Sequence, residues 1–190
     1  MTNTDDAQRK QRTMTMAKVY PVGVLLVSVL LNYFAFGVIP VAVALPSVAS
    51  IVALVISAAL LVMNHTWLMT TIELTRVRFG MYATPEEWTA SGTHSQDAPK
   101  EGLRELERRH NAHRNTTENT VYFALLAGIF VLVSPPALAA QAWIIGFAVA
   151  RLGYTYSYLV GNTNLRGFFM SLSLLAMYGM ASYLAISVVA

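Results

Sequence analysis

The sequence contains no cysteine among its 190 residues. This absence excludes disulfide frameworks, iron–sulfur clusters, thiolate metal sites and cysteine nucleophiles. Charge is scarce as well: Asp, Glu, Lys and Arg make up 12% of the chain, about half of the share usual in soluble globular domains. Because 55% of the residues are hydrophobic, the composition excludes a disordered protein and argues against a soluble enzyme.

The charged residues are missing from three long stretches, 19–72, 119–150 and 167–190. A helix needs about 20 apolar residues to cross a bilayer, so the first stretch is long enough for two crossings. Proline and glycine mark the breaks, at Pro40 and Pro46, at Ser134-Pro135-Pro136 and at Gly161-Asn162. These patterns predict five membrane spans, at residues 19–39, 47–75, 117–134, 142–160 and 167–188.

The basic residues indicate how these spans are oriented. With five spans, the basic residues at 9–18, 76–114, 151 and 166 all fall on or towards one side of the membrane. Since basic residues collect on the cytoplasmic side, we expect a cytoplasmic N-terminus, an outside C-terminus and a multi-pass protein of a bacterial inner membrane or its equivalent. A cleaved signal peptide is the alternative for the first span, but the apolar run 22–44 is longer than the usual 7–15 residues, which favours a retained anchor.

The segment between the second and third spans has two parts. Residues 83–100 are polar and rich in turn formers, which predicts a cytoplasmic loop. Helix formers return after Pro99, and we expect one helix from about residue 100 to Ser134, with its first half projecting into the cytoplasm.

Polar groups at the edges of the spans are the candidate functional residues, because such groups are costly in hydrocarbon. Glu73 and Arg76 share a helix face, and an ion pair at the membrane interface is their simplest interpretation. Arg114, Asn115 and Glu118 lie together at the entry of the third span, where an intrahelical salt bridge competes with a functional cluster.

The fourth span carries a second polar stripe, formed by Arg151, Tyr154 and Tyr158 at helical spacing. An aromatic belt is one interpretation, but an arginine two turns inside a span requires a partner, and we expect Glu118 or Glu73 in that role. Arg166, just before the fifth span, is by itself a topology anchor.

A metal site is not expected. Glu107, His110 and His113 lie near one helix face, but di-iron bundles need a Glu-x-x-His pattern on two helices and this chain holds one copy. The sequence also gives no reason to expect a nucleic-acid partner.

Three segments together resemble the family of membrane-associated proteins in eicosanoid and glutathione metabolism (MAPEG). The first segment is Arg76-Val77-Arg78, followed by Pro85-Glu86. The second, which is the most specific, runs from Glu107-Arg108 to His113-Arg114-Asn115-x-x-Glu118-Asn119. The third is Arg151-Leu152-x-Tyr154-x-x-x-Tyr158, followed by Leu165-Arg166. The resemblance covers about residues 47–190. It implies an all-α membrane domain, a four-helix bundle that assembles as a homotrimer, with a cytoplasmic loop at about 77–116. Residues 1–46 would then form a cytoplasmic tail and an added N-terminal transmembrane helix.

The resemblance also implies a function. It suggests a glutathione-dependent membrane transferase acting on a lipophilic electrophile, with peroxidase activity towards lipid hydroperoxides as an accompanying expectation. Glutathione would bind between subunits, with Arg166 as the catalytic residue that holds the thiolate. The binding residues would be Arg76, Arg114, Asn115, Glu118, Arg151, Tyr154 and Tyr158. Tyr154 stands where prostaglandin synthases have His and leukotriene C synthases have Tyr, and Gly167 replaces the Ser of some members. A non-catalytic lipid-binding or scaffold protein of the same fold is the alternative.

Overall fold

The computed structural model of the protein describes residues 3–190, and Met1 and Thr2, at the start of the predicted N-terminal tail, lie outside the described residues. Over the described range the chain is helical and contains no strand. Its elements are α1 (Asn3–Leu31) with a π-helical end η1 (Asn32–Phe36), α2 (Val48–Phe79), α3 (Pro85–Ser91), a short 3-10 helix η2 (Ser95–Asp97), α4 (Lys100–Leu132), α5 (Ala137–Ala140), a π-helical stretch η3 (Gln141–Ile145), α6 (Gly146–Leu159) and α7 (Thr163–Val189).

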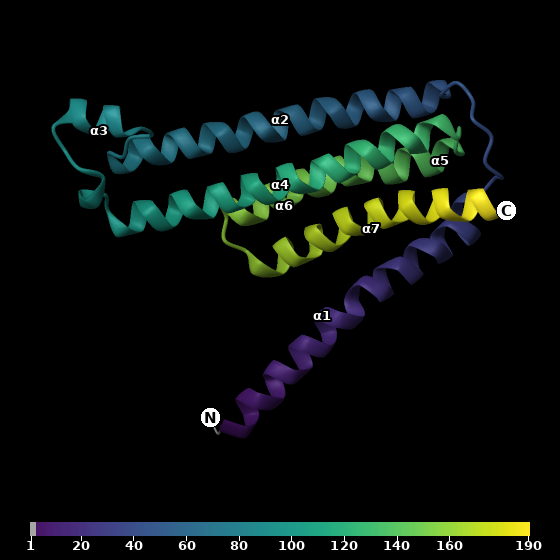
Figure 1. The fold of residues 1–190 in the computed structure, drawn as a ribbon, viewed down its shortest axis with the longest axis horizontal. Coiled ribbons are helices and arrows are strands. Elements are labelled where there is room, and N and C mark those ends of the chain that lie inside the picture. The colour runs from purple at the N-terminus through teal and green to yellow at the C-terminus, as the bar shows by residue number, and fades with distance from the viewer. Residues whose placement is uncertain (1–2) are drawn as a thin grey trace.

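Helices α2, α4, α6 and α7 lie side by side and form an elongated bundle, with α3 at one end (Figure 1). Its core lies towards the other end and is built from aromatic pairs between helices. The rings of Phe123 and Phe147 stack at 4.1 Å, and Phe130 meets Tyr183 edge-on at 5.1 Å. Small residues let the helices approach closely, as where Gly179 of α7 packs on the indole of Trp143.

Helix α1 meets the bundle near the C-terminal end of α7 and diverges from it towards the N-terminus (Figure 1). A buried polar network makes the junction. The Asn32 amide donates to the Gly179 carbonyl at 2.8 Å and to Ser182 Oγ at 2.9 Å, and it accepts from Trp143 Nε1 at 2.9 Å. Ser28 Oγ lies 3.1 Å from Ser182 Oγ. Since both polar atoms of the Asn32 side chain have hydrogen-bond partners, the network holds η1 in one position against η3 and α7.

The helix ends follow the sequence signals. The helix expected from about residue 100 to Ser134 is confirmed as α4, and it ends where Ser134 takes a left-handed backbone at φ 46° before Pro135-Pro136. Gly161 at φ 70° and the Asn162 side chain, which caps α7, make the turn between α6 and α7. The plain loop expected over 83–100 is wrong in part, because Thr84 and Glu87 form a capping box and Pro85 starts the helix, which together stabilise α3.

Within residues 3–190, four helical stretches are long and apolar enough to cross a membrane: Lys10–Phe36, Val48–Phe79, Ala137–Leu159 and Thr163–Val189. Helix α4 is as long as α2, but its first half carries the charged and amide side chains and its apolar part begins only at Val121. The protein is therefore an integral membrane protein by the character of its helices. The fifth crossing, through α4, and the orientation of the termini remain predictions.

Candidate functional site

The guanidinium of Arg151 lies fully buried at the contact of α6 with α4. Its Nη2 donates to Asn115 Oδ1 at 2.9 Å and to Thr116 Oγ1 at 2.7 Å, and its Nη1 approaches Met170 Sδ at 3.7 Å. The expectation of a carboxylate partner, Glu118 or Glu73, is therefore wrong for the described chain. Neutral acceptors hold the charge instead, because α4 presents its amide and hydroxyl side chains to α6.

The stripe expected along α6 is confirmed and extends to the start of α7. The Arg151 guanidinium carbon lies 4.2 Å from the centre of the Tyr154 ring, and the rings of Tyr154 and Tyr158 are 5.2 Å apart. The guanidinium carbon of Arg166 lies 5.0 Å from the centre of the Tyr158 ring. Two cations thus sit on the faces of two tyrosines, an arrangement that attracts each cation to the π-electrons of its ring. Arg151 is buried at one end, and Arg166 is partly exposed at the other.

Helix α4 turns its other predicted residues outward. Arg114 is exposed and donates to Asn111 Oδ1 at 2.7 Å, one turn back. The intrahelical salt bridge between Arg114 and Glu118 does not form. Glu118 is exposed and has neither a hydrogen bond nor an ion pair with any described residue. The exposed face of α4 therefore offers a cation and an unpaired carboxylate one turn apart.

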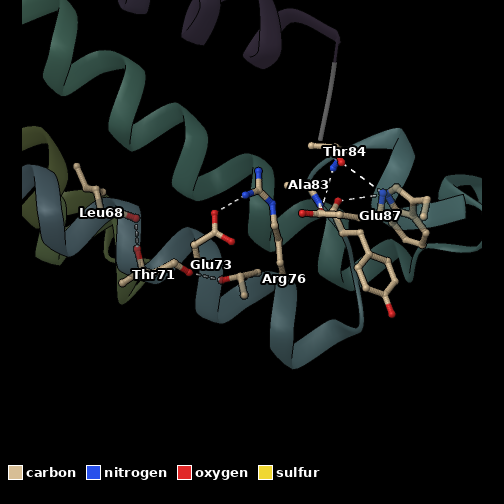
Figure 2. A network of polar contacts seen from close by, with 10 residues as sticks. Leu68, Thr71, Glu73, Arg76, Ala83, Thr84 and Glu87 are labelled. Carbon is tan, nitrogen blue, oxygen red and sulfur yellow. Dashed lines mark hydrogen bonds and ion pairs between the residues drawn. The ribbon is translucent and has the colours of Figure 1, made fainter. Parts of the chain in front are cut away.

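Arg76 lies in the last turn of α2 and forms the ion pair with Glu73 that the spacing indicated (Figure 2). Its Nε is buried and has no partner among the described residues. The chain then turns away at Gly80, whose φ of 60° ends the helix, and the next helix begins at the capping box of Thr84 and Glu87. Arg76 is not linked by a hydrogen bond or ring contact to the stripe of α6.

The set predicted from the sequence thus separates into two groups within one chain. Asn115, Arg151, Tyr154, Tyr158 and Arg166 form one connected series. Arg76, Arg114 and Glu118 lie apart from the series, and the last two face outward. Asn115, which belongs to the series, directly follows Arg114 and lies three residues before Glu118 on the same helix.

A pair of histidines, His65 of α2 and His113 of α4, joins these two helices. His113 Nε2 and His65 Nδ1 are 3.1 Å apart, with the rings tilted by 43°. Burial lowers the pKa of His113, and the neighbouring His65 and His110 lower it further. Burial also lowers the pKa of His110, and nearby Arg76 adds to that effect while Glu73 opposes it. At neutral pH the lowered pKa keeps His113 uncharged, so the pair shares one hydrogen bond.

No cluster of three or more metal-ligating side chains occurs among the side chains that the structure describes. The candidate ligands Glu107, His110 and His113 do not converge there. Glu105, one turn before Arg109, is occupied in ion pairs with Arg108 and Arg109, and the hydrogen bond from Arg109 lowers the pKa of its carboxyl.

Sequence reasoning missed Thr116, Met170 and His65. Thr116 directly follows Asn115, but a threonine in a helix is commonplace and gave no signal. His65 interrupts a charge-free stretch, which was the signal that could have found it. Asn64, also in that stretch, is fully buried, and both of its amide atoms lack a partner in the described chain.

Comparison with known proteins assigns the chain to a family. No curated protein matches the sequence. The model of the MAPEG family matches residues 51–186, which span α2 to α7 and contain every predicted site residue. The match begins after α1 and η1. The chain therefore belongs to the MAPEG family.

Proposed function

We propose that this protein is a glutathione-dependent membrane transferase that activates the glutathione thiol for attack on a lipophilic electrophile. The observation that carries the proposal is the connected series from Asn115 through Arg151, Tyr154 and Tyr158 to Arg166. Family membership supports a role in glutathione-related membrane metabolism. The residues of this chain support the finer assignment as follows.

The donor set fits glutathione, which carries two carboxylates, one ammonium and one thiol. Arg76 and Arg151 each keep a buried Nε–H without a partner among the described residues. The Arg76 side chain is 18% exposed, whereas Arg151 is fully buried, so Arg76 is the one of the two that a ligand anion can reach directly. Glu118, unpaired and exposed, suits the ammonium. Arg114 lies one turn from Glu118, and its guanidinium can bind one of the glutathione carboxylates.

Arg166 is the group that would act on the thiol. A free thiol has a pKa of about 8.5, so that only about 3% is ionised at pH 7. A fixed cation beside the sulfur favours the thiolate, and an arginine stays charged where a lysine could lose its proton. The thiolate would form the carbon–sulfur bond, while the leaving group departs with its electron pair and the thiol proton passes to water.

The position of Arg166 suits a lipophilic partner. It lies in the first turn of α7, at the end of a stretch apolar enough to cross a membrane. An electrophile dissolved in the bilayer could approach the sulfur from the side. We further propose that the complete site lies between copies in a homotrimer, because Arg114 and Glu118 face outward from the chain that holds the series.

The test is a glutathione titration of the detergent-purified protein, followed by the ultraviolet difference spectrum of the thiolate. We expect a saturable thiolate signal that Arg166→Ala abolishes. Arg104→Ala is the matched control, because Arg104 is exposed in the first turns of α4 and bonds only to the Lys100 carbonyl. A thiolate signal of full size in Arg166→Ala would overturn the assigned role. The absence of glutathione binding at millimolar concentration in the folded protein would favour the scaffold alternative.

A further inference from the structure

A groove of about 1140 Å³ separates the middle of α1 from the first half of α7. One wall is the α1 face from Thr13 to Val27. The other wall is formed by Phe168, Ser171, Leu172 and Leu175 of α7. Apart from a few hydroxyl groups the walls are apolar, and side chains such as Met16, Val19 and Phe168 remain more than half exposed.

The groove is a consequence of how α1 is attached. The polar network of Ser28 and Asn32 fixes α1 to α7 at one end only, and the two helices diverge from that point (Figure 1). Gly23 lies midway along the open part, and a Cβ placed there would meet no atom within 4 Å. The apolar face of α1 in this region therefore has no partner within the described chain.

The groove lies on the far side of α7 from the proposed thiol site. Arg166 reaches towards Tyr158 of α6. Ser171 and Leu175 follow Arg166 by five and nine residues, which at about 100° per residue places them on the opposite face of the helix. We therefore do not assign the groove to the lipophilic substrate of the proposed transferase.

The length of the groove matches one leaflet of a bilayer. From Thr13 to Val27, the α1 wall rises by roughly 21 Å at 1.5 Å per residue. The hydrocarbon of one leaflet is about 15 Å deep, half of the usual 30 Å. An acyl chain along α1 would therefore be covered over the depth of the leaflet. The remaining rise of roughly 6 Å, in the turn nearest Thr13, would lie beside the headgroup at the N-terminal end of the groove.

The mouth is basic. Residues 9–18 contain four basic residues and no acidic one. Lys10 and Arg12 are exposed and directly precede Thr13, the first residue of the wall. In the orientation predicted from the charges, this end faces the cytoplasmic leaflet, whose anionic lipids attract such residues. The α1 helix of a second copy, docked in the groove in the same membrane orientation, would bring the same basic segment beside this one, and the like charges would repel.

We propose that the groove between α1 and α7 is a binding site for an anionic phospholipid. Its acyl chains lie between the two helices, and its phosphate is held by Lys10 and Arg12. Bound there, the lipid fills the space that the protein leaves open and fastens the middle of α1 to the bundle.

The test is native mass spectrometry of the purified protein in detergent, titrated separately with phosphatidylglycerol and with phosphatidylcholine of identical acyl chains. We expect phosphatidylglycerol to bind more tightly. The double variant Lys10→Ala/Arg12→Ala should weaken its binding roughly 25-fold, about fivefold for each basic residue, and weaken phosphatidylcholine binding less, because the choline cation offsets the phosphate charge of that lipid. The control Lys100→Ala/Arg104→Ala removes two exposed positive charges at the start of α4 and should have no effect.

A second variant separates the groove from charge alone. Gly23→Leu places an apolar side chain in open space within α1, so the variant should fold and should lose binding of both lipids at this site. Equal binding of the two lipids by the native protein, or unchanged phosphatidylglycerol binding in both variants, would overturn the proposal. Because the chain has no cysteine, Gly23→Cys supplies a single thiol, and an intermolecular disulfide in the membrane would instead identify a second copy as the occupant.

Discussion

One buried nitrogen of Arg151, Nη2, donates to both Thr116 Oγ1 and Asn115 Oδ1, at 2.7 and 2.9 Å, and so ties α6 to α4. Both acceptors are neutral. A charge buried in this way depends on the few hydrogen bonds that it makes, because no carboxylate of the described chain compensates it and its Nε–H has no partner there. The pair of acceptors on α4 therefore positions Arg151, from which the series continues along α6 to Arg166.

Replacing Thr116 by valine tests this dependence. The change preserves the shape of the side chain and removes one of the two acceptors of Arg151 Nη2. We expect the free energy of unfolding to fall by about 1–3 kcal/mol, because a buried charged donor loses a partner. Thermal or denaturant unfolding in detergent measures the effect.

The neighbouring Thr117→Val is the control. Thr117 is exposed and donates only to the His113 carbonyl within its own helix, so its replacement should stay within about 0.5 kcal/mol of the native protein. Equal losses in the two variants would show that helix propensity, and not the bond to Arg151, sets the cost.

Much of this architecture could be predicted from the sequence because it follows from long-range composition. The charge-free stretches predicted helices that the structure shows at 48–79, 137–159 and 163–189, and Pro99 and Pro135 marked the limits of α4. Three- and four-residue spacing placed Arg151, Tyr154 and Tyr158 on one stripe. Local signals of this kind survive in the fold because neighbouring helices do not alter them.

The partners across helices could not be predicted. Helical spacing gives the face of a residue but not the residue opposite, so Arg151 was assigned a carboxylate and instead met Thr116 and Met170. His65 drew no attention because its partner, His113, lies on another helix. The early start of α1, at Asn3, escaped prediction because its first turns are polar and lack the apolar pattern of the rest of the helix.

Glu118→Gln tests the proposed contact with the ammonium of glutathione. The carboxylate has no partner in the described chain, so its loss should leave the melting temperature unchanged. The dissociation constant for glutathione should rise roughly tenfold to hundredfold, since a hydrogen bond to a charged group contributes about 1.5–3 kcal/mol. Isothermal titration calorimetry in detergent measures both the affinity and the enthalpy.

Glu101→Gln makes the same chemical change on an exposed glutamate in the first turn of α4, distant in sequence from the site. It should retain the native affinity. If Glu118→Gln also retains it, Glu118 does not contact the ligand and the outward face of α4 has another role.

The His65–His113 contact should make stability depend on pH. The pKa of His113 is lowered in the folded protein, so below about pH 6.5 the unfolded chain binds protons more readily than the folded one. The free energy of unfolding should therefore fall as the pH drops from 7.5 to 5.5. His110, whose pKa is lowered as well, contributes in the same direction.

His113→Gln removes the titrating group from this contact, and its melting temperature should decline less steeply over the same range. His94→Gln removes an exposed histidine between α3 and α4 and should keep the native slope. Identical slopes in all three proteins would assign the pH dependence to other groups.

Gly179→Ala tests the close packing that joins α1, α6 and α7. A Cβ at this position would lie 2.5 Å from the Trp143 ring, which is too close for any non-bonded pair. The indole cannot easily move away, because its Nε1 is bonded to Asn32 and Phe36 packs edge-on against it. We expect a loss of about 1–3 kcal/mol and a melting temperature several degrees lower.

Gly128→Ala is the matched control within α4, where a Cβ would meet nothing within 4 Å. Alanine is the better helix former, so this variant should gain up to about 1 kcal/mol. The two substitutions are chemically identical, so shifts of opposite sign would establish that Gly179 is required by contact with Trp143. Equal shifts would mean that α1 and the indole can move apart without cost, and that the junction at Asn32 is weaker than its hydrogen bonds indicate.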